Sequence, residues 1–406
     1  MKVGRTRKYH SLRRLLAATI TVIAATTAAS CSQTVAGHPG PGMNPVDLTR
    51  LEYGTFPTEP TPFEMEISTD WDIYSLESRR MFGYLVSPYA ADPDLRFLLE
   101  TEMLRDGTDT LNDMTPPEFE PIAKQNFFVS GVATRRSNNS PRNGKDTVIA
   151  LMRFGNDQYA RTAAAEFNSW TEARSPGRQK IEMTGYPDTY AGISADQQRG
   201  QLYAAHGPYV ILAAIEAPAT EAIRMGDRLR RVLELQSDAL NDLTPTPLDD
   251  ILDLPTDPDG MMSLPLPDQY QDSAAFGYHG AYPAAAYAHF EYDAQAIPDY
   301  NAYGVDLVAR NDSIVYRTAG VPQAFALQTV LTRPGKYDKE VEGPPGLPDA
   351  RCVERDETPP MFDPFVCVVV YDRYVALVDD ISIGNLPSPE LFQRTSAQYS
   401  ILANSR

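Results

Sequence analysis

Two stretches of similar pattern decide the fold: LYAAHGPYVILAAI at residues 202–215 and VCVVVYDRYVALVD at residues 366–379. In each stretch, two apolar arms flank a short polar turn, and the second arm begins with Tyr-Val-x-Leu, at Tyr209 and at Tyr374. Short apolar runs that are separated by turn residues predict β-hairpins. Because hairpin-connected strands pair antiparallel, both stretches indicate antiparallel sheets.

The elements around the two hairpins recur in the same order. Before and after the first hairpin, apolar patterns predict strands at 127–134, 147–154, 180–183 and 190–194 and helices at 156–170 and 220–240. In the helix at 156–170, Tyr159, Ala163, Phe167 and Trp170 follow helical spacing. Around the second hairpin, the patterns predict strands at 303–308 and 313–316, a helix at 322–332 and a terminal helix after Ser388, which is a suitable N-cap.

Three matches in the same order align the two regions. The hairpins coincide, Gly131-Val132 corresponds to Gly304-Val305, and Arg153 and Arg317 each end a strand shortly before a helix. We interpret these matches as an internal duplication. Two unrelated α+β domains with a similar order of elements are the alternative.

The predicted fold class is α+β. Each repeat forms an antiparallel sheet with one face covered by two helices, so the protein consists of two repeated sheet/helix sandwiches of ferredoxin-like character. The open face of each sheet needs a cover, and packing of one repeat against the other supplies it. The strand order within each sheet is not readable from the sequence.

The chain divides into five predicted parts. They are a signal peptide (1–30), a flexible tether (31–47), an N-terminal α+β domain (48–241), a linker rich in Pro and Asp (242–270) and a C-terminal α+β domain (271–406). Within the N-terminal domain we also expect a helix near 89–104. The linker is expected to be solvated.

The first 30 residues carry six basic residues and no acid, and they contain the apolar run at 15–29. A basic start, a short apolar core and small residues predict a secretory signal peptide. The sequence AASC at 28–31 resembles the lipobox of bacterial lipoproteins, which implies lipidation of Cys31. The protein would then be anchored through its N-terminal lipid on the outer face of the bacterial cytoplasmic membrane, in the cell envelope.

The charge balance excludes a nucleic-acid binder. The 36 Lys and Arg residues face 54 Asp and Glu residues, for a formal charge of −18. Neutralising phosphates requires a basic surface, which this composition does not supply.

Three cysteines occur: Cys31, Cys352 and Cys367. If Cys31 is acylated, two remain in a protein that meets an oxidising compartment, which favours a disulfide between Cys352 and Cys367. Two unpaired buried thiols are the alternative. The spacing matches no zinc motif, and no metal or cofactor is expected.

These features resemble a family of uncharacterised actinobacterial secreted lipoproteins with a lipobox and a duplicated α+β region. The resemblance rests on AASC at 28–31, GVDLVAR at 304–310, VYR at 315–317 and Cys367 followed by Tyr374-Val375-Ala376. It spans nearly the whole mature chain. The resemblance implies a cellular location and a fold, and it implies no catalytic activity.

Motifs for catalysis are absent from the sequence. No Gly-x-Ser-x-Gly, no phosphate-binding loop and no His-based zinc motif occurs. His279 and His289 are the histidines that a convergent hydrolase would use. The carboxylate pairs Glu64/Glu66 and Asp379-Asp380 are read as solvated side chains.

The tyrosines gather between residues 278 and 303. Tyrosine combines an apolar ring with a polar tip and is favoured at interfaces. The candidate surface for a ligand or partner comprises Tyr278, His279, Tyr282, Tyr287 and Tyr292. A domain interface or ordinary packing is the alternative.

The leading functional hypothesis is a membrane-anchored envelope lipoprotein that binds a ligand, glycan or protein partner without catalysis. The alternative is an envelope hydrolase that acts on wall or lipid material. A third option is a structural accessory of a larger envelope complex.

Overall fold

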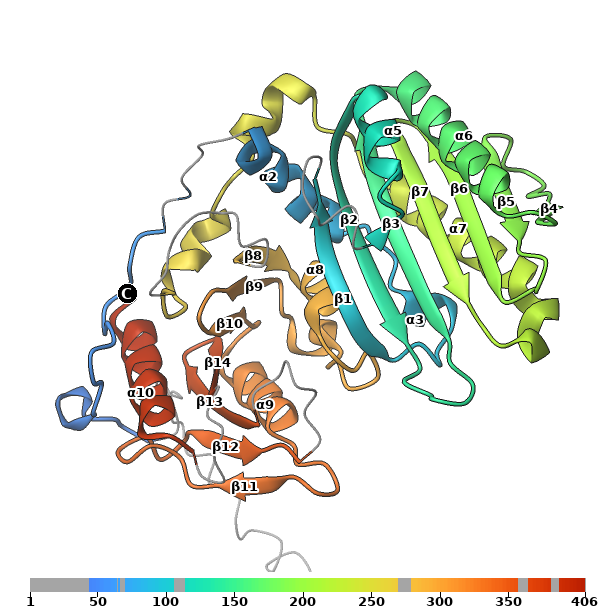
Figure 1. Ribbon diagram of the computed structural model, residues 1–406. Helices are drawn as coiled ribbons and strands as arrows, with labels where there is room; N and C mark the ends of the chain where they lie inside the picture. The colour runs from blue at the N-terminus through green and yellow to red at the C-terminus, as the bar shows by residue number, and fades with distance from the viewer. Residues whose placement is uncertain are drawn as a thin grey trace, which may run out of the picture. The chain divides into compact units, whose positions relative to one another are not determined.

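The computed structural model describes residues 44–63, 65, 70–105, 114–268, 279–356, 364–380 and 387–405 (Figure 1). The predicted signal peptide, Cys31 and the tether up to residue 43 lie outside the described residues. Among the residues that are described, no helix is long and apolar enough to cross a membrane.

The first sheet has seven strands in the order β1-β2-β3-β7-β6-β5-β4, all antiparallel. Its strands are β1 (Phe97–Leu104), β2 (Phe128–Ser137), β3 (Asp146–Phe154), β4 (Gln179–Ile181), β5 (Thr189–Ile193), β6 (Arg199–His206) and β7 (Tyr209–Glu216). The predicted hairpin is formed by β6 and β7.

The second sheet also has seven antiparallel strands, in the order β8-β9-β10-β14-β13-β12-β11. Its strands are β8 (Gly280–Pro283), β9 (Leu307–Arg310), β10 (Ile314–Arg317), β11 (Lys339–Val341), β12 (Arg351–Glu354), β13 (Phe365–Tyr371) and β14 (Tyr374–Asp380). The second predicted hairpin is β13–β14. The two sheets share one strand order, and the prediction of two similar α+β sandwiches is confirmed.

The pairing register confirms two of the three sequence matches and corrects the third. Arg153 pairs with Tyr209 in the first sheet, and Arg317 pairs with Tyr374 in the second. Gly131 pairs with Met152, and Val308 pairs with Tyr316. Each of these partners directly precedes the arginine of its repeat, so Gly131 is equivalent to Val308. The match of Gly131 with Gly304 is therefore wrong, because it depended on a shared dipeptide.

The last two helices of each repeat occur at equivalent places in the order of elements. The described α-helices are α2 (Asp70–Phe82), α3 (Pro88–Ala91), α5 (Phe119–Gln125), α6 (Asp157–Arg174), α7 (Met225–Asn241), α8 (Ala284–Tyr287), α9 (Val321–Leu331) and α10 (Pro389–Asn404). Short 3-10 helices are η1 (Leu48–Arg50), η2 (Ala219–Arg224), η3 (Leu248–Asp253), η4 (Pro258–Ser263), η5 (Ala288–Phe290) and η6 (Tyr300–Tyr303). Ser388 caps α10 as predicted, because its side chain accepts from the Leu391 N–H at 3.0 Å.

The two helices of each repeat lie on opposite faces of the sheet, which corrects the expectation that both cover one face (Figure 1). In the first repeat, Phe167 of α6 packs with Tyr203, whereas Leu229 of α7 packs with the adjacent Leu202. Neighbouring strand residues point to opposite faces, so each sheet is buried on both sides. In the second repeat, α9 and α10 divide the faces in the same way.

The largest core joins the two repeats. It contains Leu229 and Val232 of α7 together with Ala324 and Leu327 of α9. The prediction that the repeats pack together is therefore correct, although they do so by contributing different helices to one core.

The predicted helix at 89–104 is wrong. The chain forms the single turn of α3 and then β1, which pairs with β2. Pro93 lies at the fifth position of the predicted helix, beyond its first turn, where it would remove a backbone hydrogen bond and clash with the preceding turn.

The predicted linker at 242–270 is not solvated over its whole length. Met261, Leu264 and Leu266 are buried. Near the other predicted boundary, Leu51 packs in the same core as Met261 and Val369 of the second sheet, although it falls in the predicted N-terminal domain. Asn44, inside the predicted tether, donates to Asp349. The domain boundaries themselves stay predictions.

Candidate functional site

The candidate tyrosine surface is corrected by burial. Tyr282 has no exposed area and Tyr287 is 3% exposed, so neither forms a surface for a partner. Tyr282 packs edge-on against Phe82 of α2, and Tyr287 packs edge-on against Tyr316. Tyr278 lies outside the described residues. This tyrosine cluster belongs to the core shared by the repeats, in agreement with the packing alternative.

The remaining members of this candidate set lie at the joint between the repeats. His279 is partly buried, and burial lowers the pKa of its ring. Tyr292 packs against Phe97 of β1 with ring centroids 5.4 Å apart, and its carbonyl oxygen accepts from the Leu98 N–H at 2.7 Å. Residues of the second repeat thus extend the free edge of β1 in the first.

Arg136 of β2 fixes this joint. Its side chain is fully buried and donates to the carbonyl oxygens of Arg96, Ala288, Glu291 and Tyr292 at 2.9–3.2 Å. Burial lowers the pKa of Arg136 to about 10, so the guanidinium stays charged at neutral pH. Three of these four carbonyls belong to the segment 288–292, which the arginine ties to the first sheet.

His289 is used structurally. It is 4% exposed, and its Nε2 atom lies 2.8 Å from the carbonyl oxygen of Leu85. Its Nδ1 atom has no hydrogen-bond partner. Burial, with a smaller contribution from Arg136, lowers the pKa of His289 to about 4. Neither ring nitrogen bonds a Ser or Asp side chain, so this histidine does not supply the base that the hydrolase alternative needs.

We expect His289 to make stability depend on pH between about 6.5 and 4. Because its folded-state pKa lies below the ordinary value of 6.5, the unfolded chain takes up the proton first as the pH falls. The free energy of unfolding then drops by about 3 kcal/mol across this window. Urea unfolding at pH 7 and pH 4 should show a smaller drop in His289→Gln than in the native protein. Equal drops in both proteins would contradict this assignment.

Glu291 lies among tyrosines at the same joint. The Tyr300 hydroxyl donates to its Oε1 atom at 2.8 Å, and burial raises the pKa of its carboxyl group. A buried carboxyl with a raised pKa is a candidate catalytic acid in a cleft. Here the surrounding rings of Tyr300 and Tyr316 pack 5.9 Å apart within the joint, which favours a structural role.

A second buried polar cluster was missed by the sequence reading. The Glu77 carboxylate of α2 has no exposed area and lies 2.6 Å from Arg153 Nη1. It also accepts from Arg80 Nε at 3.0 Å and from the Thr246 hydroxyl at 2.9 Å. Tyr209, the partner of Arg153 across the sheet, borders the cluster, and burial raises its pKa to about 12. The cluster holds α2 and the segment after α7 on the end of the first sheet.

The other candidate groups offer no metal site in the described part of the chain. No group of three His, Cys, Asp or Glu side chains is placed there to hold an ion. Glu64 and Glu66 lie outside the described residues. A recess lined by Val46, Leu347, Ala350 and Tyr399 has room for about one water molecule. It is far smaller than the sites that enclose small-molecule ligands.

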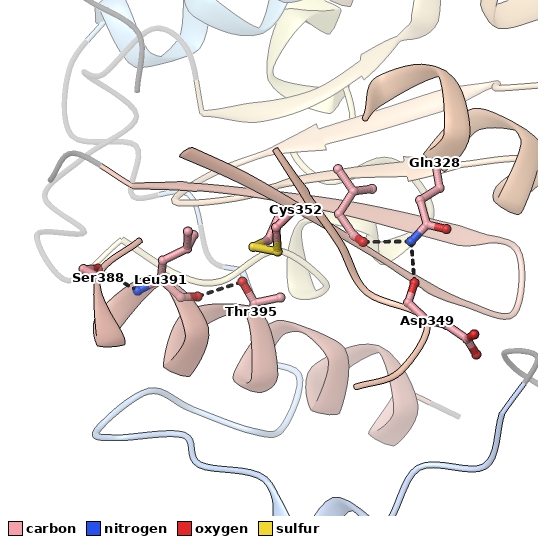
Figure 2. The surroundings of a disulfide bond; sticks show 8 residues. Gln328, Asp349, Cys352, Ser388, Leu391 and Thr395 are labelled. Carbon is pink, nitrogen blue, oxygen red and sulfur yellow. Dashed lines mark hydrogen bonds between the residues drawn. A yellow bond between two sulfur atoms is a disulfide. The ribbon is translucent and has the colours of Figure 1, made fainter. Parts of the chain in front are cut away.

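The structure forms the predicted disulfide between Cys352 and Cys367. The two residues are paired directly across β12 and β13, and both are buried with Leu391 of α10 (Figure 2). Gln328 of α9 donates to the carbonyl oxygens of Asp349 and Val368, both at 2.8 Å, and so fastens the same strands. The disulfide therefore cross-links neighbouring strands of the second sheet.

Removing this cross-link is expected to destabilise the protein. A disulfide that closes a loop of this length contributes about 3 kcal/mol in the chain-entropy model, and the residue separation is 15. The double variant Cys352→Ala/Cys367→Ala should unfold at a lower urea concentration than the oxidised protein. Reduction should shift the native protein toward the variant and leave the variant unchanged. Equal unfolding midpoints for all samples would rule out a stabilising disulfide.

Two exposed aromatic residues meet on the first repeat. Phe127 is 52% exposed and Tyr159 is 41% exposed, and their rings stack with centroids 6.0 Å apart. The sequence pattern predicts Phe127 in the strand at 127–134, and it predicts Tyr159 in a helix at a spacing shared with Ala163, Phe167 and Trp170. The helix is correct, but its buried face is formed by Ala160, Ala163 and Phe167.

Comparisons with known proteins give a family and a distant structural likeness. No curated protein sequence matches the chain. Among solved structures, the extracellular domain of PknH from Mycobacterium tuberculosis is similar at 9% identity and a TM-score of 0.32, over 45% of this chain and 100% of that one. Residues 66–256 match the family described as "Domain of unknown function (DUF7373) N-terminal", and residues 255–405 match "Domain of unknown function (DUF7373) C-terminal". The two matches follow one another along the chain, which belongs to this two-part DUF7373 family.

Proposed function

We propose that the protein is an envelope lipoprotein that is anchored through Cys31 and acts by binding a ligand or partner outside the cell. The assignment as a lipid-anchored protein rests on the resemblance to actinobacterial lipoproteins and on the lipobox at 28–31. The anchor would hold the two repeats at the outer face of the cytoplasmic membrane.

The observation that carries the extracytoplasmic address is the Cys352–Cys367 disulfide. Disulfides form and persist on the secretory route and are rare in the cytosol. The disulfide also leaves Cys31 as the one cysteine of the sequence outside the pair. Cleavage before Cys31 removes six basic residues, leaving 30 basic and 54 acidic residues and a formal charge of −24.

A binding role is supported by how the described polar groups are used. Arg136, His289 and Glu77 all contact neighbouring chain segments inside the fold. Because helices cover both faces of each sheet, we expect a ligand to bind at the outer surface of the protein. These features favour binding over catalysis.

Anchoring predicts that Cys31→Ala releases the protein from membranes or stalls its processing. The thiol of Cys31 is the acceptor of the lipid, and more than one acyl chain is needed for stable anchoring. Fractionation of expressing cells should find the native protein in the membrane pellet and the variant in the soluble fraction or as an uncleaved precursor. Ser30→Ala, which keeps a small residue before the cysteine, serves as the matched control. Unchanged membrane retention and mass of Cys31→Ala would refute lipidation.

A further inference from the structure

The exposed aromatic pair stands where a helix ends and a strand begins. Phe127 follows Asn126, the C-cap of α5, and directly precedes β2, and Tyr159 lies in the first turn of α6. The two rings stack at an interplanar angle of 26°. The first turn of α6 is fixed by Asn156, whose side chain accepts from the Tyr159 N–H at 3.0 Å. The pair is thus held by two helix ends and not by a loose loop.

The backbone at Phe127 is strained. Its φ is +57°, in the left-handed region that bulky residues rarely adopt. Helices often end on a left-handed residue, and that residue is usually glycine. In the second repeat, Arg317 pairs with Leu307. Three residues before Leu307 stands Gly304, with a φ of +58°. Phe127 likewise precedes Ser130, the partner of Arg153, by three residues, and the strand register shifts between Phe128 and Ser130. The repeats share the turn, and the first repeat fills it with phenylalanine.

The opposing residue is matched to the ring. Gly155 lies two residues after Arg153, and a Cβ atom added there would be 2.3 Å from Phe127 Cδ1. The residue two after Arg317 is Ala319, and a Cβ atom on Gly304 would be 2.6 Å from the Ala319 Cβ. The first repeat therefore pairs a large residue with glycine, and the second pairs glycine with alanine. Each helix, α6 and α9, starts four residues after the arginine of its repeat. Tyr159 is the third residue of α6, and the third residue of α9 is Gln323.

Strain that is kept at an exposed position calls for a function, since the second repeat shows that glycine makes the same turn. We propose that Phe127 and Tyr159 form a binding platform for an uncharged glycan chain. Aromatic rings stack on the apolar C–H faces of sugar rings. Beside Tyr159, Gln158 and Thr162 are linked at 3.4 Å on the exposed surface of α6 and supply amide and hydroxyl groups for sugar hydroxyls.

The size of the platform favours a glycan over a protein. A large aromatic side chain buries about 150–250 Å² when fully covered, so two half-exposed rings offer roughly 200 Å². A stable protein interface needs roughly 800 Å² on each partner. Among described residues, the other large apolar side chains that are exposed are Leu99, Ile223, Leu248, Leu252 and Tyr337. None of them stacks with this pair, so the patch is on the scale of sugar rings.

The charge of the surroundings favours an uncharged chain. The protein carries a formal charge of −18, which repels polyanions. Near the platform, Glu166 is engaged by the side-chain amides of Gln125 and Asn126 at 2.6–2.8 Å. Arg161 of α6 donates to Gln158 Oε1 at 3.3 Å, so one cation lies beside the platform. Asp157 and Glu166 of the same helix offset its charge, and the net negative charge of the protein disfavours a polyanion.

The test is affinity electrophoresis of the full mature lipoprotein in a polyoxyethylene detergent, which presents no sugar. Native gels would contain glycogen, laminarin, mannan or arabinogalactan, with polygalacturonate as the anionic comparison. We expect at least one uncharged polysaccharide to retard the native protein. Phe127→Gly, which copies the turn of the second repeat, and Tyr159→Ala should each weaken this binding about tenfold. Tyr337→Ala, at a tyrosine that is 56% exposed elsewhere, should migrate like the native protein.

Folding and binding are separated by the glycine variant. Phe127→Gly removes the ring at a left-handed position, so its thermal midpoint should be unchanged or higher than that of the native protein. Four results would each overturn the proposal. Two concern the variants: native-like retardation of Phe127→Gly, or a loss in Tyr337→Ala equal to that in the platform variants. Two concern the native protein: no retardation in any of the four neutral gels, or retardation by polygalacturonate alone. This inference rests on the proposed binding role, but its failure leaves the anchoring result of Cys31→Ala untouched.

Discussion

Replacing Glu77 by Gln is expected to lower the free energy of unfolding by about 3–5 kcal/mol. Gln keeps the shape of the side chain but removes the charge that faces Arg153, 2.6 Å away and itself buried. Removing one partner of a buried ion pair leaves the other charge without compensation. The buried cluster around Glu77 holds α2 on the first sheet, so the loss of this ion pair should destabilise the whole fold. Urea unfolding monitored by circular dichroism measures the change.

The control for this prediction is Glu182→Gln. Glu182 is exposed between β4 and β5, and a surface substitution of this kind changes stability by about 0.5 kcal/mol or less. If Glu77→Gln unfolds at the same urea concentration as Glu182→Gln, the buried cluster does not stabilise the fold.

Replacing Arg136 by Met is the second change with a large expected effect, a loss of about 4 kcal/mol. Met fills part of the volume but leaves four carbonyl oxygens without their charged donor. Because three of the four belong to segment 288–292, amide hydrogen exchange in that segment should accelerate more than in β6 or β7. Urea unfolding and exchange mass spectrometry measure the two effects.

The neighbouring Arg135 provides the matched control. Its side chain is 38% exposed and pairs with Asp146 at 2.7 Å. An exposed ion pair contributes about 0–1 kcal/mol, so Arg135→Met should be nearly neutral and should leave exchange at 288–292 unchanged. Equal effects of the two arginine substitutions would contradict the role given to Arg136.

The sequence predicted the hairpins and their equivalence because local patterns determine them. The Tyr-Val-x-Leu motif placed Tyr209 and Tyr374 at the same register position, opposite Arg153 and Arg317. The Gly131–Gly304 match failed because glycine has two different roles: Gly131 lies within β2, and Gly304 ends a 3-10 helix in the left-handed region.

The placement of the helices was missed although a signal for it was present. Strands that are buried on both faces carry continuous apolar runs, whereas strands with one solvated face alternate. The run VCVVV at 366–370 does not alternate, and four of its five residues are buried. Read in that way, it indicates helices on both faces of the second sheet.

The candidate site was the least predictable part, because burial depends on contacts between distant segments. Tyr282 and Tyr287 have the composition of a binding surface, yet they meet Phe82 and Tyr316 in the shared core. The exposure of Phe127 and Tyr159 depends on a left-handed turn that a phenylalanine gives no reason to expect. The signal that could have found it is the equivalence of Phe127 with Gly304, once the register is known.

The central claim is that this chain is exported, anchored through Cys31 and oxidised at its other two cysteines. Intact mass spectrometry of the protein purified from its own membranes tests all three parts together. We predict the mass of residues 31–406 plus lipid on Cys31, less the two hydrogens lost in forming the Cys352–Cys367 disulfide. A mass that retains residues 1–30, or that begins elsewhere without lipid, would contradict the account.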